Sequence, residues 1–221
     1  CAPPALVDIA VPRPAAGEVL LQIDACGLNF ADLLMAKGTY QDTPEVPFTL
    51  GMEVCGTVLA HGAGVSAPPV GARVAVFGGQ GGLAERGVFP AALCRLVPDA
   101  MTAAQAAGFQ VAYGTSHLAL TRRARLQKGE TLLVLGAAGG VGLTAVEIGC
   151  AMGARVIACA RGAAKLEAAR AAGAHHLIDS HTDDIRAIAK DLGGVDVVYD
   201  PVGGDQFTAA FRACRPEARI L

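Results

Sequence analysis

The sequence predicts an α/β protein in which a small barrel-like domain of short strands precedes a doubly wound parallel sheet. Three observations predict this fold class. Short apolar runs bounded by glycine or proline fill the first hundred residues, strand and helix patterns alternate from about residue 130 onward, and a turn of small residues joins an apolar run to a helical segment at residues 131–152. We expect the first domain to cover residues 1–100 and the second to cover residues 101–221.

The first domain is expected to contain several strands and one short helix. Its strands are predicted at residues 18–24, 51–58, 72–77 and 83–89, and a flexible glycine turn, GGQGG, precedes the last of them. The short helix is expected near Leu34 and Met35. A proline-rich loop that carries Tyr40 then leads to the second strand.

The second domain is expected to open with helices and to continue as an alternation of strands and helices. Thr102 can cap a helix with Gln105 at the capping-box position, and residues 111–123 predict a second helix. Strands are then expected at residues 131–135, 155–159, 175–179 and 195–199, and helices at 141–152, 164–172 and 183–191. This alternation requires a parallel sheet with right-handed crossovers.

The turn at residues 136–142, GAAGGVG, is the centre of the second domain. It has the pattern A-x-G-x-x-G, which is similar to the fingerprint of dinucleotide-binding turns. Such a turn can bind a phosphate, because the N–H groups at the start of the helix lack partners. The alternative is a turn that only caps the strand, in a chain with 28 glycines. The predicted cofactor-binding residues of this turn are Ala137, Ala138, Gly139, Gly140, Val141 and Gly142.

The composition excludes several classes of protein. With 52% hydrophobic residues, 17% charged residues and a net charge of −2, the chain has no electrostatic reason to bind nucleic acid or a membrane surface. It has no apolar run of membrane-spanning length, and its first ten residues lack the basic and apolar regions of a signal peptide. Its seven cysteines are scattered without a C-x-x-C pair, which is typical of free thiols in a reducing compartment. We therefore expect a cytoplasmic protein.

From the two ends of the sequence we expect that both ends of the chain were either cut or never recorded. It opens on Cys1 without an initiator methionine, and its last residues lie inside an apolar run. We expect the C-terminal part of the parallel sheet to be missing after about its fifth strand. A chain ending there is expected to have an incomplete catalytic domain.

Five motifs, in this order, resemble one known family: CGLNFADLLMAKGTY, PFTLGMEVCGTV, VAYGT, GAAGGVG and YDPVGG. The chain resembles the quinone oxidoreductases, the zeta-crystallin-like branch of the medium-chain dehydrogenase/reductase superfamily, from about Val19 to its end. The resemblance implies a GroES-like catalytic domain, then a Rossmann domain, with NADPH in the cleft between them and a homodimer for the full-length protein. In that family the chain returns from the Rossmann domain to complete the catalytic domain, and here that return is lacking.

The metal ligands of related zinc alcohol dehydrogenases are replaced in this sequence. By resemblance, Asn29 occupies the position of the first cysteine ligand, and Met52 that of the histidine in the G-H-E motif. Cys26 and Cys55 are possible substitutes, but apolar-flanked thiols without a partner histidine are more often core residues. We expect no metal.

Without a metal, reduction of an activated acceptor is the easier reaction. Hydride goes to a carbon of a quinone or enone, and hydrogen-bond donors stabilise the charge that collects on the carbonyl oxygen. The resemblance puts Asn29 and Tyr40 at the nicotinamide end of the cleft, so both are predicted catalytic residues. The alternative is a turn-forming asparagine and a loop tyrosine that covers apolar surface. Asp32 is expected only to cap or orient the helix.

The residues after the second strand of the Rossmann domain favour NADPH over NADH. Ala160 stands where an acid would bind the ribose of NAD. Arg161 and Lys165 follow as two cations for a 2′-phosphate, and Lys165 matches the lysine that this family uses for it. The alternative is two solvated charges at the start of an exposed helix. Two positions depart from the family: Ser180, still a predicted cofactor-binding residue, replaces a tyrosine that some relatives have near the adenosine, and Val111 replaces a threonine that many have on the nicotinamide side.

A last candidate segment, residues 200–204, follows the fourth strand of the Rossmann domain. Ligands of open α/β sheets lie at the carboxyl ends of strands, so Val202 and Gly203 are predicted to contact the cofactor. A glycine turn without a ligand is the alternative.

Three functions fit these residues. The first is an NADPH-dependent reductase of a quinone or enone, and the second is a reductase of 2-enoyl thioesters. The third is a non-catalytic NADPH-binding or RNA-binding protein, as some relatives are. The basic residues Arg122, Arg123, Arg125 and Lys128 are the candidates for RNA contact, but a solvated helix face explains them better, so nucleic acid is not the expected partner.

Overall fold

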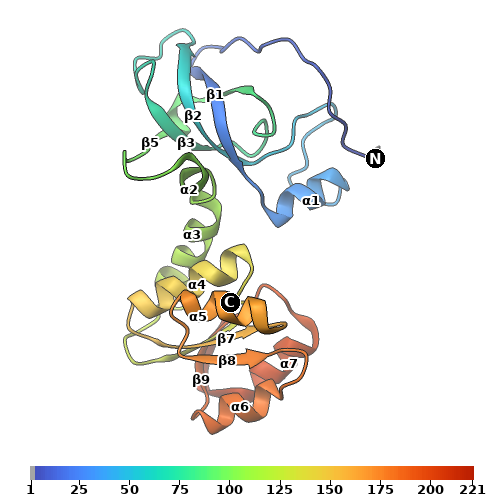
Figure 1. The fold of residues 1–221 in the computed structure, drawn as a ribbon, viewed down its shortest axis with the longest axis vertical. Coiled ribbons are helices and arrows are strands. Elements are labelled where there is room, and N and C mark those ends of the chain that lie inside the picture. Colours follow the sequence, from blue (N-terminus) through green and yellow to red (C-terminus); the bar gives the residue numbers. More distant parts are fainter. Residues whose placement is uncertain (1–2) are drawn as a thin grey trace. The chain divides into compact units, whose positions relative to one another are not determined.

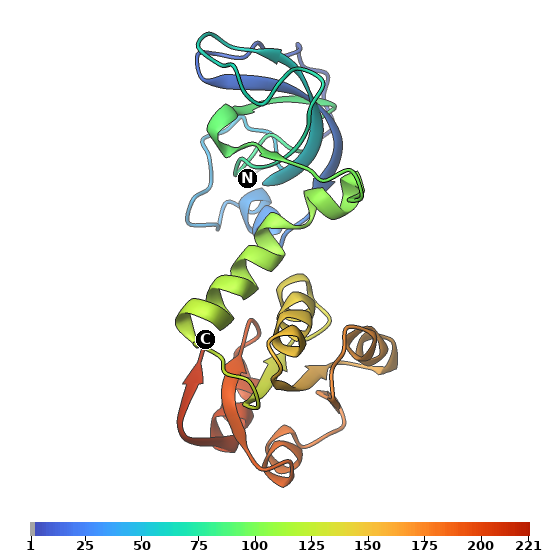
Figure 2. The same ribbon diagram turned by 90° about the vertical axis from the view of Figure 1, so that its left-hand side faces the viewer.

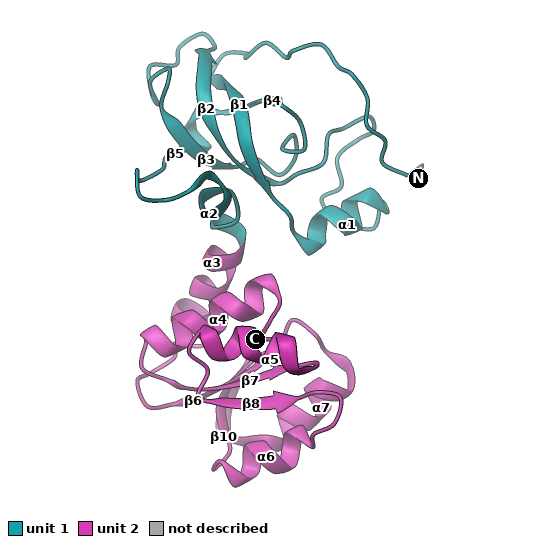
Figure 3. Ribbon diagram, in the orientation of Figure 1, with its two compact units in different colours: residues 1–111 teal, residues 112–221 magenta. Residues whose placement is uncertain are grey.

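The computed structural model describes residues 3–221, so the cysteine at position 1 lies outside the described residues. The chain divides into two compact units, unit 1 at Cys1–Val111 and unit 2 at Ala112–Leu221 (Figure 3). Each unit contains its own sheet and its own apolar core. No helix in the described part of the chain is long and apolar enough to cross a membrane.

Unit 1 is built on one antiparallel sheet of five strands in the order β4-β1-β2-β3-β5, which are labelled in Figure 3. Two register shifts in β1 bend this strand, as bulges do. The apolar core on the buried face of the sheet contains Leu21, Val54 and Phe89. This sheet confirms the predicted class of the first domain. Its strands are β1 (Glu18–Gly27), β2 (Glu53–His61), β3 (Arg73–Phe77), β4 (Arg86–Pro90) and β5 (Arg95–Leu96).

The fourth strand begins later than the predicted residue 83. The N–H of Leu83 donates to the carbonyl of Leu50 at 2.7 Å, and the N–H of Gly82 donates to that of Gly51 at 2.9 Å. These residues therefore pair with the loop before β2, and pairing with β1 starts only at Arg86.

The helices of unit 1 are short. Besides α1 (Phe30–Ala36) and α2 (Ala103–Ala107), there is one 3-10 turn, η1 (Ala91–Leu93). The predicted capping box at α2 is confirmed, because the N–H of Gln105 donates to the Thr102 hydroxyl and the Gln105 side chain accepts from the Thr102 N–H.

The predicted helix at residues 111–123 is two segments instead. The helix α3 (Gln110–His117) spans the boundary between the units in the sequence, and a π-helical segment, η2 (Leu118–Arg123), follows it. The N–H of Ala124 donates five residues back to Ala119, and the Thr121 hydroxyl donates to the His117 carbonyl at 2.6 Å. Leu120 and Ala124, in and directly after this wider helical turn, are both buried. The apolar pattern of the sequence does not distinguish such a turn from an α-helix.

Unit 2 is a five-stranded parallel sheet in the order β10-β9-β6-β7-β8. Helices cover both faces (Figures 1 and 2): α4 and α5 supply Ala145 and Ala169 to one core cluster, and α6 and α7 supply Ala189 and Ala210 to the other. The predicted doubly wound sheet is thus confirmed. Its elements are β6 (Thr131–Leu135), α4 (Gly140–Ala151), β7 (Arg155–Ala160), α5 (Ala163–Ala171), β8 (His176–Asp179), α6 (Ile185–Asp191), β9 (Val195–Tyr199), α7 (Gly204–Ala213) and β10 (Cys214–Ile220).

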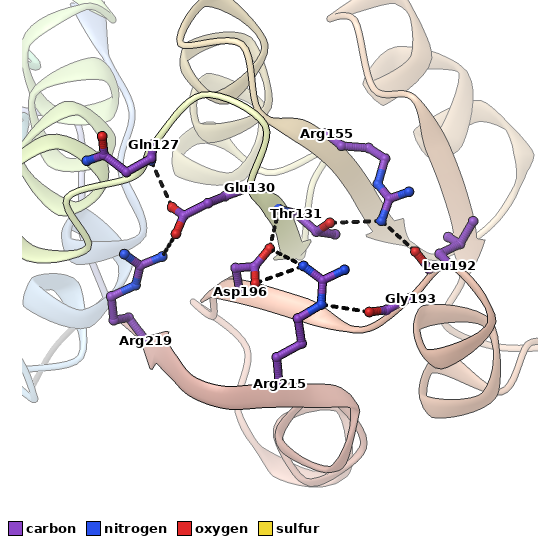
Figure 4. Close-up of polar contacts among 9 residues, drawn as sticks. All are labelled: Gln127, Glu130, Thr131, Arg155, Leu192, Gly193, Asp196, Arg215 and Arg219. Atoms are coloured by element: carbon purple, nitrogen blue, oxygen red, sulfur yellow. Dashed lines mark hydrogen bonds and ion pairs between the residues drawn. The ribbon is translucent and has the colours of Figure 1, made fainter.

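A polar network ties the strands of unit 2 together (Figure 4). The carboxylate of Asp196 in β9 accepts from the N–H of Thr131 in β6 at 2.8 Å and pairs with the Arg215 guanidinium of β10 at 2.7 Å. A second ion pair, 2.6 Å long, joins Arg219 of β10 to Glu130, next to β6. Asp196, Thr131 and Glu130 lie at or next to the starts of β9 and β6, so their contacts leave the carboxyl ends of β6 and β9 free for ligands.

Candidate functional site

The turn after β6 presents open N–H groups at the start of α4. Gly139 is the N-cap residue, and in residues 3–221 no acceptor pairs with the N–H groups of Gly140, Val141 or Gly142. The first turn of α4 contains no acid. Three open N–H groups at the positive end of a twelve-residue helix form a site for an anionic oxygen.

The glycines of this turn differ in the space around them, and so in the reason for having no side chain. A Cβ on Gly142 would lie 2.2 Å from the Gly136 carbonyl oxygen, so Gly142 is needed where α4 packs against the turn. A Cβ on Gly140 would meet nothing within 4 Å, and Gly139 and Gly140 are exposed. The turn therefore has an open face at Gly139 and Gly140, where backbone atoms can approach a phosphate, which fits a dinucleotide. Ala137 and Ala138 are buried or half-buried behind this face.

The end of β7 carries the predicted cations. Ala160 is buried, Arg161 is exposed directly after it, and Lys165 is exposed on the first turns of α5. None of the ion pairs among the described residues involves Arg161 or Lys165. Both cations can therefore take a phosphate group.

An acid that the sequence reasoning missed lies beside this loop. The carboxylate of Asp179, the last residue of β8, accepts from the N–H of His181 at 3.0 Å and from that of Gly162 at 3.1 Å. The His181 N–H, the Gly162 N–H and the charges of His181 and Arg161 hold the pKa of Asp179 below its usual 3.8, against the opposing effect of burial. Asp179 could have been found from sequence only by knowing that β8 neighbours β7. Ser180 follows it, and its N–H donates to the Ala160 carbonyl.

The loop after β9 lies against the phosphate turn. One carboxylate oxygen of Asp200 accepts from the N–H groups of Val202 and Gly203, both at 2.8 Å, and Gly203 has a φ of 75°. A Cβ on Gly136 would lie 2.9 Å from a methyl carbon of Val202, so the Val202 side chain covers Gly136. The structure thus brings two of the predicted cofactor segments together at the carboxyl ends of β6 and β9.

In unit 1, Asn29 is held by two carboxylates. It is the N-cap of α1, where its N–H donates to Asp32 at 2.9 Å, and Asp32 also accepts from the N–H of Gly51 at 3.1 Å. Its side-chain Nδ2 donates to Oε1 of Glu53 at 3.0 Å. The other oxygen of Glu53 accepts from the N–H of Val111 at 3.0 Å.

Glu53 is the second residue that sequence reasoning missed. It is 2% exposed at the start of β2, between the buried residues Met52 and Val54. A carboxylate in an otherwise apolar strand needs hydrogen-bond donors around it. The position of Glu53 in such a strand was therefore the sequence signal that could have identified it.

Tyr40 lies in a turn after α1 and is half-exposed. Its carbonyl accepts from the Thr43 hydroxyl at 2.6 Å and from the Thr43 N–H at 3.2 Å. No hydrogen bond among the described residues joins Tyr40 to Asn29.

The two thiols considered as substitute metal ligands, Cys26 and Cys55, both have raised pKa values. Burial, with the charges of Asp32 and Glu53, raises the pKa of Cys26 to about 11. Burial also raises the pKa of Cys55. In residues 3–221 no three His, Cys, Asp or Glu side chains gather in a group that could hold a metal ion.

The comparisons with known proteins agree with this architecture. Residues 15–99 match the alcohol dehydrogenase GroES-like domain, and residues 140–221 match the family described as zinc-binding dehydrogenase. The chain is 38% identical over 214 residues to the human synaptic vesicle membrane protein VAT-1 homolog, and it covers 54% of that protein with 96% of its own length. It is 37% identical over 223 residues to bovine quinone oxidoreductase-like protein 2, with 99% of this chain and 64% of that protein covered. It therefore spans between half and two thirds of these relatives.

Among solved structures, the quinone oxidoreductase of Thermus thermophilus, which has been solved also in complex with NADPH, superposes with a TM-score of 0.87. That protein is 37% identical to this chain, which aligns over 99% of its own length and 69% of the other's. The order of motifs, the two domain matches and this superposition agree. The chain belongs to the quinone oxidoreductase, zeta-crystallin-like branch of the medium-chain dehydrogenase/reductase superfamily.

Proposed function

We propose that this protein is an NADPH-dependent oxidoreductase that transfers a hydride to a quinone or another activated carbonyl or enone acceptor, without zinc. The observation that carries the proposal is the carboxyl end of the unit 2 sheet. There, three open N–H groups at the start of α4 follow one strand, and two exposed cations, Arg161 and Lys165, follow the next. Membership of the quinone oxidoreductase branch supports it.

The residues of unit 2 divide the binding of NADPH among them. The N–H groups of Gly140, Val141 and Gly142 would hold the diphosphate, and Lys165 with Arg161 would pair with the 2′-phosphate. Gly203 and Val202 would border the cofactor beside the phosphate turn. Ala160, in place of an acid, leaves room for the 2′-phosphate without a repulsive charge at that position.

The residues of unit 1 would act on the acceptor. Bound NADPH supplies a hydride, and the carbonyl oxygen of the acceptor then gains negative charge. The Asn29 amide, with one N–H on Glu53, has a second N–H to donate to that oxygen. Tyr40 is the second proposed donor.

The acceptor class follows from the donors at this site. An amide and a thioether, from Asn29 and Met52, are poor zinc ligands compared with the thiolate and imidazole of zinc alcohol dehydrogenases. Neutral donors suffice for an acceptor whose carbonyl is already activated. We therefore propose reduction of quinones or enones and not oxidation of alcohols.

The test is an assay of nucleotide oxidation with a panel of quinones, enones and 2-enoyl thioesters, run with NADPH and with NADH on the full-length protein, because this chain spans only 54 to 69% of the relatives reported above. We expect turnover of quinones or enones with NADPH. Faster turnover of enoyl thioesters would assign the protein to that reductase class. Binding of NADPH without turnover of any acceptor would indicate a non-catalytic role, and failure to bind NADPH would overturn the proposal.

A further inference from the structure

Glu53 is a buried carboxylate with two neutral donors and no cation. It is 2% exposed, its Oε1 accepts from Asn29 Nδ2 at 3.0 Å, and its Oε2 accepts from the backbone N–H of Val111 at 3.0 Å. None of the ion pairs in the described residues involves Glu53. A buried carboxylate is costly unless donors satisfy it, so both hydrogen bonds are needed where they are.

The chemistry of a carboxylate fixes the direction of the Asn29 amide. An ionised carboxylate only accepts, so the amide must turn its NH₂ group toward Glu53 and its oxygen elsewhere. The backbone of Asn29 is held independently, because its N–H donates to Asp32 at 2.9 Å. Asn29 is therefore restrained at its main chain by one acid and at its side chain by another.

The space for Glu53 is built into the neighbouring strand. A Cβ on Gly27 of β1 would lie 2.8 Å from Glu53 Oε1 and 2.5 Å from the carbonyl oxygen of Ala107. The absent side chain at Gly27 thus lets the carboxylate lie against β1. Gly27 and Glu53 are also directly paired residues in the ladder between β1 and β2.

We propose that Glu53 is a positioning residue that orients the Asn29 amide so that one N–H is held and the other is free to donate to the acceptor. Glu53 does this while its second oxygen binds Val111, the last residue of unit 1, in the first turn of α3. The orientation of Asn29 is thereby coupled to the start of the helix that continues into the unit with the phosphate turn. The catalytic consequence rests on the function proposed above, whereas the orientation itself does not.

The orientation can be measured directly because Asn29 is the only asparagine in the sequence. Protein labelled with ¹⁵N at asparagine alone gives one side-chain NH₂ signal pair in an NMR spectrum. In the unmodified protein we expect one of the two protons to exchange with solvent much more slowly than the other. Equally fast exchange of both protons, as in a free amide, would overturn the proposal, and this result needs no variant that has to fold.

Glu53→Leu is the matching variant. Leucine has a similar size but offers no acceptor to Asn29 or to Val111. We expect the slow Asn29 proton to become fast and its signal to move. The control is Glu85→Leu, the same chemical change at an exposed glutamate of unit 1, which should leave the signal pair unchanged. An unchanged Asn29 signal in Glu53→Leu would overturn the proposal.

The catalytic consequence is tested by a double-mutant cycle. Glu53→Leu should lower kcat by about 10- to 100-fold, because a misplaced donor loses much of its effect, while KM for NADPH changes by less than about twofold. In an Asn29→Ala background the same substitution should have little further effect on kcat. Fully multiplicative losses would show that Glu53 does not act through Asn29. If the unmodified protein turns over no acceptor, the proposed function fails, and the NMR experiment still decides whether Glu53 holds Asn29.

Discussion

The carboxylate of Asp179 accepts a hydrogen bond from the N–H of Gly162 at 3.1 Å, which joins the end of β8 to the loop after β7. Arg161 directly precedes Gly162, and the positive charge of Arg161 contributes to lowering the pKa of Asp179. The loop at the proposed 2′-phosphate site is therefore held by a negatively charged group. Arg161 is balanced in part by that charge, so we propose Lys165 as the cation with the more direct role in binding a phosphate.

Lys165→Ala should weaken NADPH binding by about 1 to 3 kcal/mol, the usual loss for a charge-assisted hydrogen bond. NADH lacks the 2′-phosphate, so its affinity should not change. Calorimetric titration with both nucleotides measures this, with Lys190→Ala, an exposed lysine at the end of α6, as control. Equal losses for the two nucleotides would contradict the assignment.

Gly142→Ala should destabilise unit 2 by about 1 to 3 kcal/mol, because the added Cβ forces α4 away from the turn. The close atom is a backbone oxygen, that of Gly136 at 2.2 Å, which cannot rotate away. Gly140→Ala is the matched control, with open space at its Cβ, and it should leave the free energy of unfolding unchanged or raise it by about 0.4 to 1 kcal/mol. Urea unfolding of the three proteins decides between these outcomes, and equal losses in both variants would refute the packing argument.

Asp179→Asn should change how stability depends on pH. The folded pKa of Asp179 is lowered below 3.8, chiefly by the His181 N–H, so its stabilising effect is present above about pH 3.8 and is lost as pH falls through the lowered pKa. Asparagine cannot be protonated in this range. The variant should be less stable than the unmodified protein at neutral pH, and the difference should shrink below about pH 3.8. Denaturant midpoints measured across this range would contradict the prediction if the difference stays constant.

Ser116→Ala should destabilise unit 2 by about 1 to 3 kcal/mol, the cost of leaving buried polar groups without partners. The Ser116 hydroxyl is fully buried, donates to the Val141 carbonyl at 2.7 Å and lies 3.1 Å from the Tyr199 hydroxyl. The neighbouring Thr115 is exposed, so Thr115→Ala should stay within about 0.5 kcal/mol of the unmodified protein. Thermal unfolding followed by circular dichroism compares the two, and a Ser116→Ala variant as stable as the Thr115 control would count against this account.

Activity should survive removal of metal ions. By the family resemblance, Asn29 and Met52 replace the ligands of zinc relatives, so we expect dialysis against a chelator to leave kcat for the best acceptor unchanged. Elemental analysis before and after dialysis gives the metal content. Stoichiometric zinc whose loss abolishes turnover, and whose return restores it, would reverse the proposal.

The second unit was predictable because its signals are local. Each strand from β6 to β9 is an apolar run, and β6 and β9 begin and end at the predicted residues. The turn at residues 136–142 was also predictable, since its glycines and the helix that follows are contiguous in the sequence.

The parts that sequence could not give depend on distant partners. The carboxylate of Glu53 binds groups 24 and 58 residues away, and Leu83 pairs with Leu50 instead of joining β4. Asp179 reaches the β7 loop only because β8 lies next to β7. The predicted roles of Asn29 and Tyr40 came from the family resemblance, and they remain predictions.

The division of the chain at Val111 affects how the protein melts. Each unit closes its own sheet and its own apolar core, so unfolding by heat or denaturant need not follow a single two-state transition. A nucleotide held by unit 2 would raise the midpoint of the transition in which unit 2 unfolds, by mass action, and would leave a separate transition of unit 1 where it was. A single melting temperature would therefore average two cooperative units that respond differently to the same ligand.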